Sequence, residues 1–123
     1  MKNIIVSTLV FASLVIASSS SALAATAKKM EMPPLARKHS CVACHAIDKK
    51  MVGPSWIDIS RKYKSVTEYT YKGKMYPLEE GLIIKVSKGG GGVWGSMPMP
   101  ANSPAVNPAD IKQLVQFILR LSE

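Results

Sequence analysis

Cysteine, histidine and acidic residues are scarce in this sequence of 123 residues, which has two cysteines, two histidines and 8 acidic against 16 basic side chains. No internal repeat is visible, and no alternation of strands with helices indicates a parallel sheet. The basic residues form no stripe interleaved with aromatic side chains and match no recognition motif, so nucleic acid is not expected as a partner. The net charge of +8 instead predicts attraction to acidic partners or anionic surfaces.

The N-terminus has the pattern of a secretory signal peptide. Lys2 supplies a basic start, residues 4–17 form an apolar stretch that is short for a transmembrane helix, and Ala22 and Ala24 suit a small-residue cleavage site. No cysteine directly follows the apolar stretch, which argues against a lipid anchor there. We therefore expect residues 1–24 to be removed on export to the periplasm, with an uncleaved signal-anchor as the alternative.

The exported chain is expected to consist of a flexible N-terminal arm at residues 25–32 and one domain at residues 33–123. A domain of this size buries a modest fraction of its surface, so a covalently attached apolar cofactor would enlarge its core. Export also places the chain in an oxidising compartment, where disulfides are allowed.

The pattern of the first half of the domain predicts two short helices. The first begins at Pro33-Pro34, since proline is tolerated in a first turn, and runs into Cys41. Residues 46–54 have turn chemistry. The second helix covers about residues 55–63, with Ser55 as its N-cap and an aspartate three residues later.

Two further helices are predicted in the second half. One covers residues 78–88, with glutamates in its first turn, lysines in its last turn and Gly89 at its end. The other begins after an Asn107 N-cap and runs to about Leu121. Its apolar stripe repeats at helical spacing and is expected to face the core: Ile111, Leu114, Val115, Ile118 and Leu119.

The segments around the third predicted helix are not helical. Residues 68–76 place tyrosines in alternation before a Lys72-Gly73 pair, which favours a small hairpin or loop. Four glycines from Gly89 to Gly92 and four later prolines exclude a helix or a central strand up to the last helix.

The motif CVACH, from Cys41 to His45, contains both cysteines and one of the two histidines. A redox dithiol of this spacing needs a βαβ context, which is missing before it. A zinc site would have to use Cys41, Cys44, His45 and His39, which lie too close together to organise a domain. A disulfide across so short a loop would constrain little of the unfolded chain. The remaining chemistry is covalent attachment of a c-type haem, with thioethers from both cysteines and the histidine as an iron ligand.

The second axial position of such a haem decides its function. A methionine closes the site and raises the reduction potential, so that electron transfer is the function that remains. An open site instead allows ligand binding or peroxide chemistry. Met97 and Met99 lie about fifty residues beyond His45, in a loop stiffened by prolines. Pro98 and Pro100 restrict the backbone on both sides of Met99 and favour it as the ligand, with packing of both methionines as the alternative.

Three segments together resemble the short bacterial monohaem class I cytochromes c, the c-551-like group. They are CVACHAIDKKMVGPSW, GGVWGSMPMPAN and the final amphipathic helix, within a likeness that covers Pro33 to Leu121. The resemblance implies an all-α fold, in which four or five short helices surround one covalent haem c. Residues 68–76 have no counterpart in the short members of the family and could form a small hairpin insertion.

The resemblance also assigns roles around the haem. It implies His45 and Met99 as axial ligands and a Pro54 carbonyl that accepts from the second nitrogen of His45. It places Trp94 near a haem propionate and Asn102 in a hydrogen bond near the Met99 sulfur. His39 is expected to be a surface residue of the first helix.

The function predicted from these features is that of a periplasmic electron carrier rather than an enzyme. We expect a monomer that exchanges electrons with acidic redox proteins: a membrane reductase, a terminal oxidase, a nitrite reductase or a dehydrogenase. The basic side chains expected to steer them are Arg37, Lys38, Lys49, Lys50, Arg61, Lys62 and Lys64. A haem enzyme or gas sensor without the methionine ligand, and a thiol or zinc module without haem, are the alternatives.

Overall fold

The computed structural model describes residues 30–123, so the predicted signal peptide at 1–24 and most of the predicted arm lie outside the described residues. Residues 30–32 have no regular secondary structure. The elements are α1 (Pro34–Lys38), η1 (Cys41–Ala43), α2 (Trp56–Tyr63), β1 (Glu68–Tyr71), β2 (Lys74–Pro77), α3 (Leu78–Lys88), α4 (Pro108–Leu119) and η2 (Arg120–Ser122). No helix among residues 30–123 combines the length and the apolar character that a bilayer span requires.

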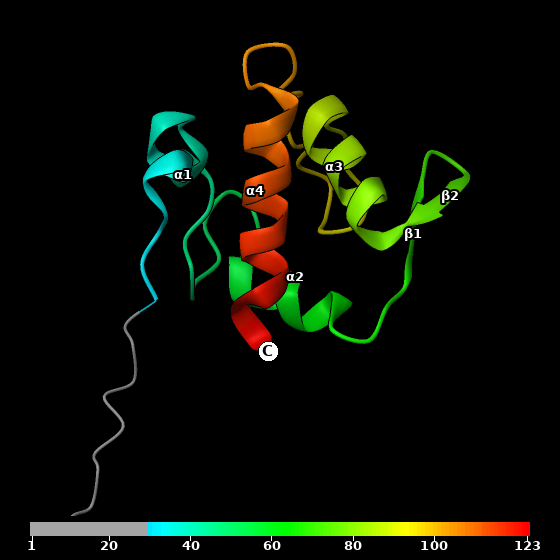
Figure 1. Ribbon diagram of the computed structural model, residues 1–123, viewed down its shortest axis with the longest axis horizontal. Coiled ribbons are helices and arrows are strands. Elements are labelled where there is room, and N and C mark those ends of the chain that lie inside the picture. The colour runs from blue at the N-terminus through cyan, green and yellow to red at the C-terminus, as the bar shows by residue number, and fades with distance from the viewer. Residues whose placement is uncertain (1–29) are drawn as a thin grey trace, which may run out of the picture.

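The predicted helical class is confirmed, and so is the hairpin. Figure 1 shows α4 in the middle of the molecule with α3 beside it, while β1 and β2 project at one side. The strands are antiparallel, and Tyr69 lies opposite Tyr76. Lys72 and Gly73 form the turn with φ values of 48° and 79°, as two-residue hairpin turns of the primed types require.

The first helix is shorter than predicted. It ends at Lys38, and Ser40 adopts a left-handed conformation with φ of 58° before the 3-10 turn at Cys41 begins. A left-handed residue cannot continue an α-helix, so the cysteine motif starts a new direction of the chain. The prediction of one continuous helix into Cys41 is therefore wrong.

The other helix boundaries follow the capping residues of the sequence. The Ser55 hydroxyl accepts from the Asp58 amide at 3.1 Å, and the Asn107 side chain accepts from the Asp110 amide at 2.8 Å. Each bond satisfies a donor that has no partner inside its helix. The 3-10 turn η2 continues the last helix to Ser122, close to the predicted end.

The core has two parts, which α4 connects. Ile111 and Val115 belong to the cluster that includes the hairpin tyrosines and Leu82, and Leu114 belongs to the cluster around Trp56. Ile111 is fully buried, which stabilises the fold by about 1.5–3 kcal/mol relative to an exposed side chain. The predicted apolar stripe of the last helix thus joins the two halves of the domain.

Candidate functional site

One apolar cavity gathers the residues that the sequence predicts to bind the cofactor. It encloses about 1320 Å³ of space, counted out to its open mouth. The predicted site residues that line it are Cys41, Cys44, His45, Pro54, Trp94, Met99 and Asn102, together with Met97. Two segments about fifty residues apart in the sequence therefore meet at one site.

The two cysteines lie at the ends of the 3-10 turn. Cys41 begins η1 and Cys44 follows its last residue as the C-cap, and both thiols are free and half-buried. Burial raises the pKa of the Cys41 thiol, with a smaller contribution from Cys44. A raised pKa opposes the reactive thiolate that a redox dithiol needs.

His45 is fixed by a hydrogen bond to the Pro54 carbonyl. Its Nδ1 lies 2.8 Å from the Pro54 oxygen. A carbonyl only accepts, so Nδ1 carries the proton and the Nε2 lone pair of the neutral imidazole is left for a metal. Histidine ligands commonly orient their rings by such a bond.

Gly53 makes this ring position possible. A Cβ atom built on Gly53 would lie 2.5 Å from Cε1 of His45 and 3.0 Å from its Nδ1. The Gly53 amide also donates to the Cys44 carbonyl at 2.8 Å, which closes the loop after the cysteine motif. The turn predicted at residues 46–54 gives no sign of this contact between Gly53 and the His45 ring.

The loop of residues 89–102 presents both methionines to the cavity. Met97 is 67% exposed, whereas Met99 is half-buried. Met99 also pairs with Gly90 as an antiparallel bridge, with its amide and carbonyl both hydrogen-bonded at 3.1 and 2.9 Å. The backbone of Met99 is thus fixed in a way that the structure does not provide for Met97.

Asn102 contacts the backbone of its own loop and of α3, and its expected role near the Met99 sulfur stays a prediction. Its side-chain nitrogen donates to the carbonyls of Val86 and Pro100, at 3.0 and 3.2 Å. An amide nitrogen has two hydrogens, so each of them has a backbone acceptor here. In this structure Asn102 fastens the methionine loop to α3.

Trp94 lies at the rim of the site. Its side chain lines the cavity and the residue is 39% exposed. The Lys62 ammonium lies 5.6 Å from the centre of its ring, within cation–π range. Contact of Trp94 with a propionate stays a prediction.

The chain matches the family model described as cytochrome c over residues 33–122. It belongs to the cytochrome c family. Cytochrome c-552 of Hydrogenobacter thermophilus is 40% identical over 90 residues, which cover 71% of this chain and 78% of that protein. Cytochrome c-551 of Allochromatium vinosum is 39% identical over 87 residues, which cover 71% and 82%.

The fold of this cytochrome c also matches a solved structure. The crystal structure of cytochrome c552 from Nitrosomonas europaea superimposes with a TM-score of 0.58 at 39% identity, over 69% of this chain and 93% of that one. The resemblance to the monohaem c-551-like group is confirmed, and the cofactor is one covalently bound haem c. Cytochromes c of this kind carry electrons between redox partners.

The cavity of this cytochrome c fits that cofactor chemically. It offers two free thiols for thioethers, an imidazole with an available Nε2 and a thioether on another segment. Most of the remaining lining is apolar, as a porphyrin requires: Ile59, Leu82, Val86, Leu114, Val115 and Ile118 are among these residues. The α4 residues in the lining carry no charge, so that side of the cavity could pack directly against a porphyrin.

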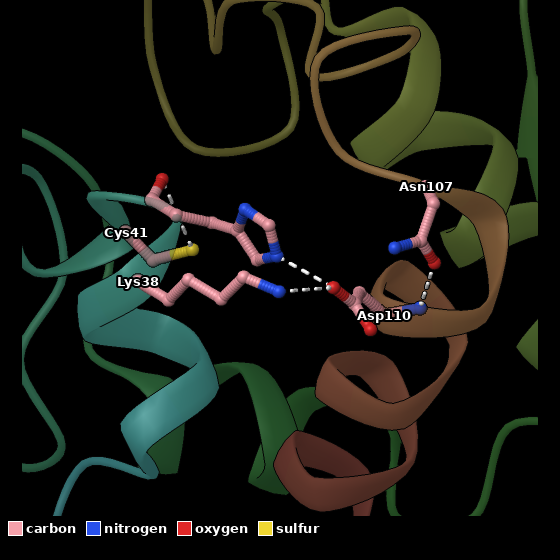
Figure 2. A network of polar contacts seen from close by, with 5 residues as sticks. Lys38, Cys41, Asn107 and Asp110 are labelled. Carbon is pink, nitrogen blue, oxygen red and sulfur yellow. Dashed lines mark hydrogen bonds and ion pairs between the residues drawn. The ribbon is translucent and has the colours of Figure 1, made fainter.

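His39 is not the surface residue that the sequence predicts. Its side chain is 11% exposed, and Nε2 lies 2.7 Å from the Asp110 carboxylate at the start of α4. Lys38 approaches the same carboxylate oxygen at 3.5 Å, as Figure 2 shows, while the Asp110 amide is held by Asn107. No local pattern announces a contact between residues 71 positions apart.

Lys85 is a further residue that sequence reasoning missed at this site. The sequence pattern places it in the last turn of a helix, whereas in the structure its side chain lines the cavity and its ammonium donates to the Gly90 carbonyl. Burial lowers the pKa of Lys85, and the charge of Lys72 lowers it further. A positive side chain therefore lies where the methionine loop begins.

Proposed function

We propose that this cytochrome c is a periplasmic electron carrier whose haem iron is held between His45 and Met99. The observation that supports the ligand pair is that both residues line one apolar cavity. Hydrogen bonds fix the ring of His45 and the main chain of Met99. When bound, the haem supplies an iron centre that accepts and releases one electron. The protein's part is to hold both ligands still, so that the site stays closed to other chemistry.

His45 and Met99 are held by different means. The Pro54 carbonyl keeps the proton on Nδ1 and so fixes which nitrogen of His45 points to the cavity. Met99 is held through its backbone, which pairs with Gly90. This rigidity suits an electron carrier because the coordination sphere need not reorganise when the electron moves.

Periplasmic location rests on the sequence of residues 1–24, which has the order of a secretory signal. The cytochromes c attach haem to two reduced thiols, and here both cysteines are free for that purpose. A mature N-terminus at or near Ala25, together with a mass increase of one haem, would support export and single attachment. An N-terminus still at Met1 on a membrane-bound product would contradict it.

Optical spectra of the full-length product and two variants test the ligand pair. We expect a low-spin spectrum with a methionine-to-iron charge-transfer band in the oxidised wild type. Met99→Ala should abolish the band and lower the reduction potential sharply, because a thioether ligand raises it. Met97→Ala is the matched control and should keep both. Loss of the band in Met97→Ala alone would assign the ligand to Met97.

A further inference from the structure

The hairpin lies next to the segment that presents Met99, and the two are joined by one hydrogen bond. The hydroxyl of Tyr71, the last residue of β1, donates to the Gly89 carbonyl at 3.0 Å in a buried position. Gly89 ends α3 and begins the methionine loop. The hairpin thus reaches the loop that carries the proposed iron ligand.

The hairpin is held firmly enough to act as a support. Tyr69 and Tyr71 point inward and are only 7% and 8% exposed, and they belong to the same core cluster as Leu82 of α3. Gly81 lets the two elements approach closely, since a Cβ atom there would lie 2.7 Å from Cβ of Tyr69. The Tyr71 ring therefore has little freedom to move away from Gly89.

The bond acts on a peptide unit that also contacts Met99. The carbonyl of Gly89 and the amide of Gly90 belong to one planar unit, so fixing the carbonyl also directs the amide. That amide donates to the Met99 carbonyl at 2.9 Å, and the Met99 amide donates back to the Gly90 carbonyl at 3.1 Å. Tyr71 and Met99 thus hold opposite ends of the same peptide.

Both residues of this peptide are glycines, which restrict the rotation of the backbone less than other residues do. Gly89 and Gly90 have φ values of 72° and 113°, in a region that glycine enters freely and other residues rarely. A Cβ atom on Gly89 would also overlap the Met99 carbonyl oxygen. A peptide flanked by two glycines can rotate with little steric resistance, so its orientation depends on its hydrogen bonds.

We infer that Tyr71 is a positioning residue for the axial methionine. Its hydroxyl fixes the Gly89–Gly90 peptide, and through that peptide it fixes the backbone of Met99. The inference rests on the proposed ligation by Met99 and adds a role for the hairpin. Lys85 of α3 donates to the Gly90 carbonyl, which belongs to the next peptide unit of the same loop.

The test compares Tyr71→Phe with Tyr76→Phe in the haem-loaded protein. Both variants remove one hydroxyl from the hairpin and keep the ring, but Tyr76 lies on β2, with its ring under the Lys74 ammonium at 5.0 Å. The readout is the binding of added imidazole to the oxidised protein, which requires Met99 to leave the iron. We expect about fivefold tighter apparent binding in Tyr71→Phe, the factor for one lost neutral hydrogen bond, and no change in Tyr76→Phe.

A second measurement, hydrogen exchange, begins with the wild type and is then repeated in Tyr71→Phe. The Gly90 and Met99 amides should be protected from hydrogen exchange to the same extent as the amides of α3, and Tyr71→Phe should weaken that protection. Equal imidazole binding in wild type and Tyr71→Phe, an equal gain in both variants, or unprotected Gly90 and Met99 amides in the wild type would each overturn the inference. A wild type without the methionine band would instead overturn the proposed ligation, and the inference with it.

Discussion

His39 Nε2 lies 2.7 Å from the Asp110 carboxylate and so ties the segment before the cysteine motif to the first turn of the last helix. The hydrogen bond from His39 is the main cause that lowers the pKa of Asp110, and Lys38 and Asn107 contribute in the same direction. The carboxylate also lies at a helix N-terminus, where negative charge is favourable. The contact therefore stabilises the charged form of Asp110.

The stability of the protein should depend on this contact in a defined pH range. A carboxyl group whose pKa is lowered by folding stabilises the protein above its unfolded pKa, near 3.8 here, and loses that effect as the pH falls through the folded value. We expect His39→Ala to lower the melting temperature at pH 6, with a difference that shrinks as the pH falls below 3.8. Melting curves from pH 2 to 6 measure it. A difference that stays constant down to pH 2 would contradict the role of Asp110.

Gly53→Ala should disturb the proposed iron ligand without changing any ligand atom. The added Cβ would lie 2.5 Å from Cε1 of His45, so the ring must move away from its bond to Pro54. Overpacking of this kind costs about 1–3 kcal/mol. We expect a lower free energy of unfolding and an altered haem spectrum. Gly91→Ala is the control, because its Cβ would meet Pro98 at an ordinary 3.5 Å, and unchanged spectra in both variants would refute the argument.

Ser60→Ala should loosen the C-terminus. The buried Ser60 hydroxyl lies 3.0 Å from the Leu119 carbonyl and 2.8 Å from the Ser122 hydroxyl, and it accepts from the Ser122 amide at 3.0 Å. Its loss leaves these partners unsatisfied, at a cost of about 1–3 kcal/mol, which exceeds the gain of a few tenths from better helix propensity. Urea unfolding of Ser60→Ala and of the exposed control Ser65→Ala measures the difference. Equal stability of the two variants would show that the network contributes little.

The basic residues near the cavity should steer negatively charged reaction partners. Lys49 and Lys50 are exposed in the loop between the cysteine motif and the cavity-lining residues Val52 to Pro54. Oxidation of the reduced protein by ferricyanide, a small anionic oxidant, should slow with rising ionic strength. Lys49→Glu/Lys50→Glu should reduce both the rate at low salt and its salt dependence. Lys112→Glu/Arg120→Glu makes the same change of charge outside the cavity lining. An equal effect of the two double variants would show that net charge, and not the position of Lys49 and Lys50, sets the rate.

Much of the fold could be predicted because its signals act over short distances. Ser55 and Asn107 cap their helices through amides three residues away, and Lys72-Gly73 turns the chain between two adjacent strands. The cysteine motif is also local, because its five residues are consecutive in the sequence. The end of the first helix was missed because Ser40 adopts a left-handed conformation that serine rarely takes and no local pattern requires.

The candidate site was predictable in its composition but not in its supports. The motif from Cys41 to His45 was enough to predict one covalent haem, and the prolines around Met99 favoured that residue as the second ligand. The contacts of His39 with Asp110 and of Tyr71 with Gly89 became visible in the folded chain and not before. Such contacts depend on how helices and strands pack across the core, since side chains distant in sequence reach each other only after apolar faces are buried together.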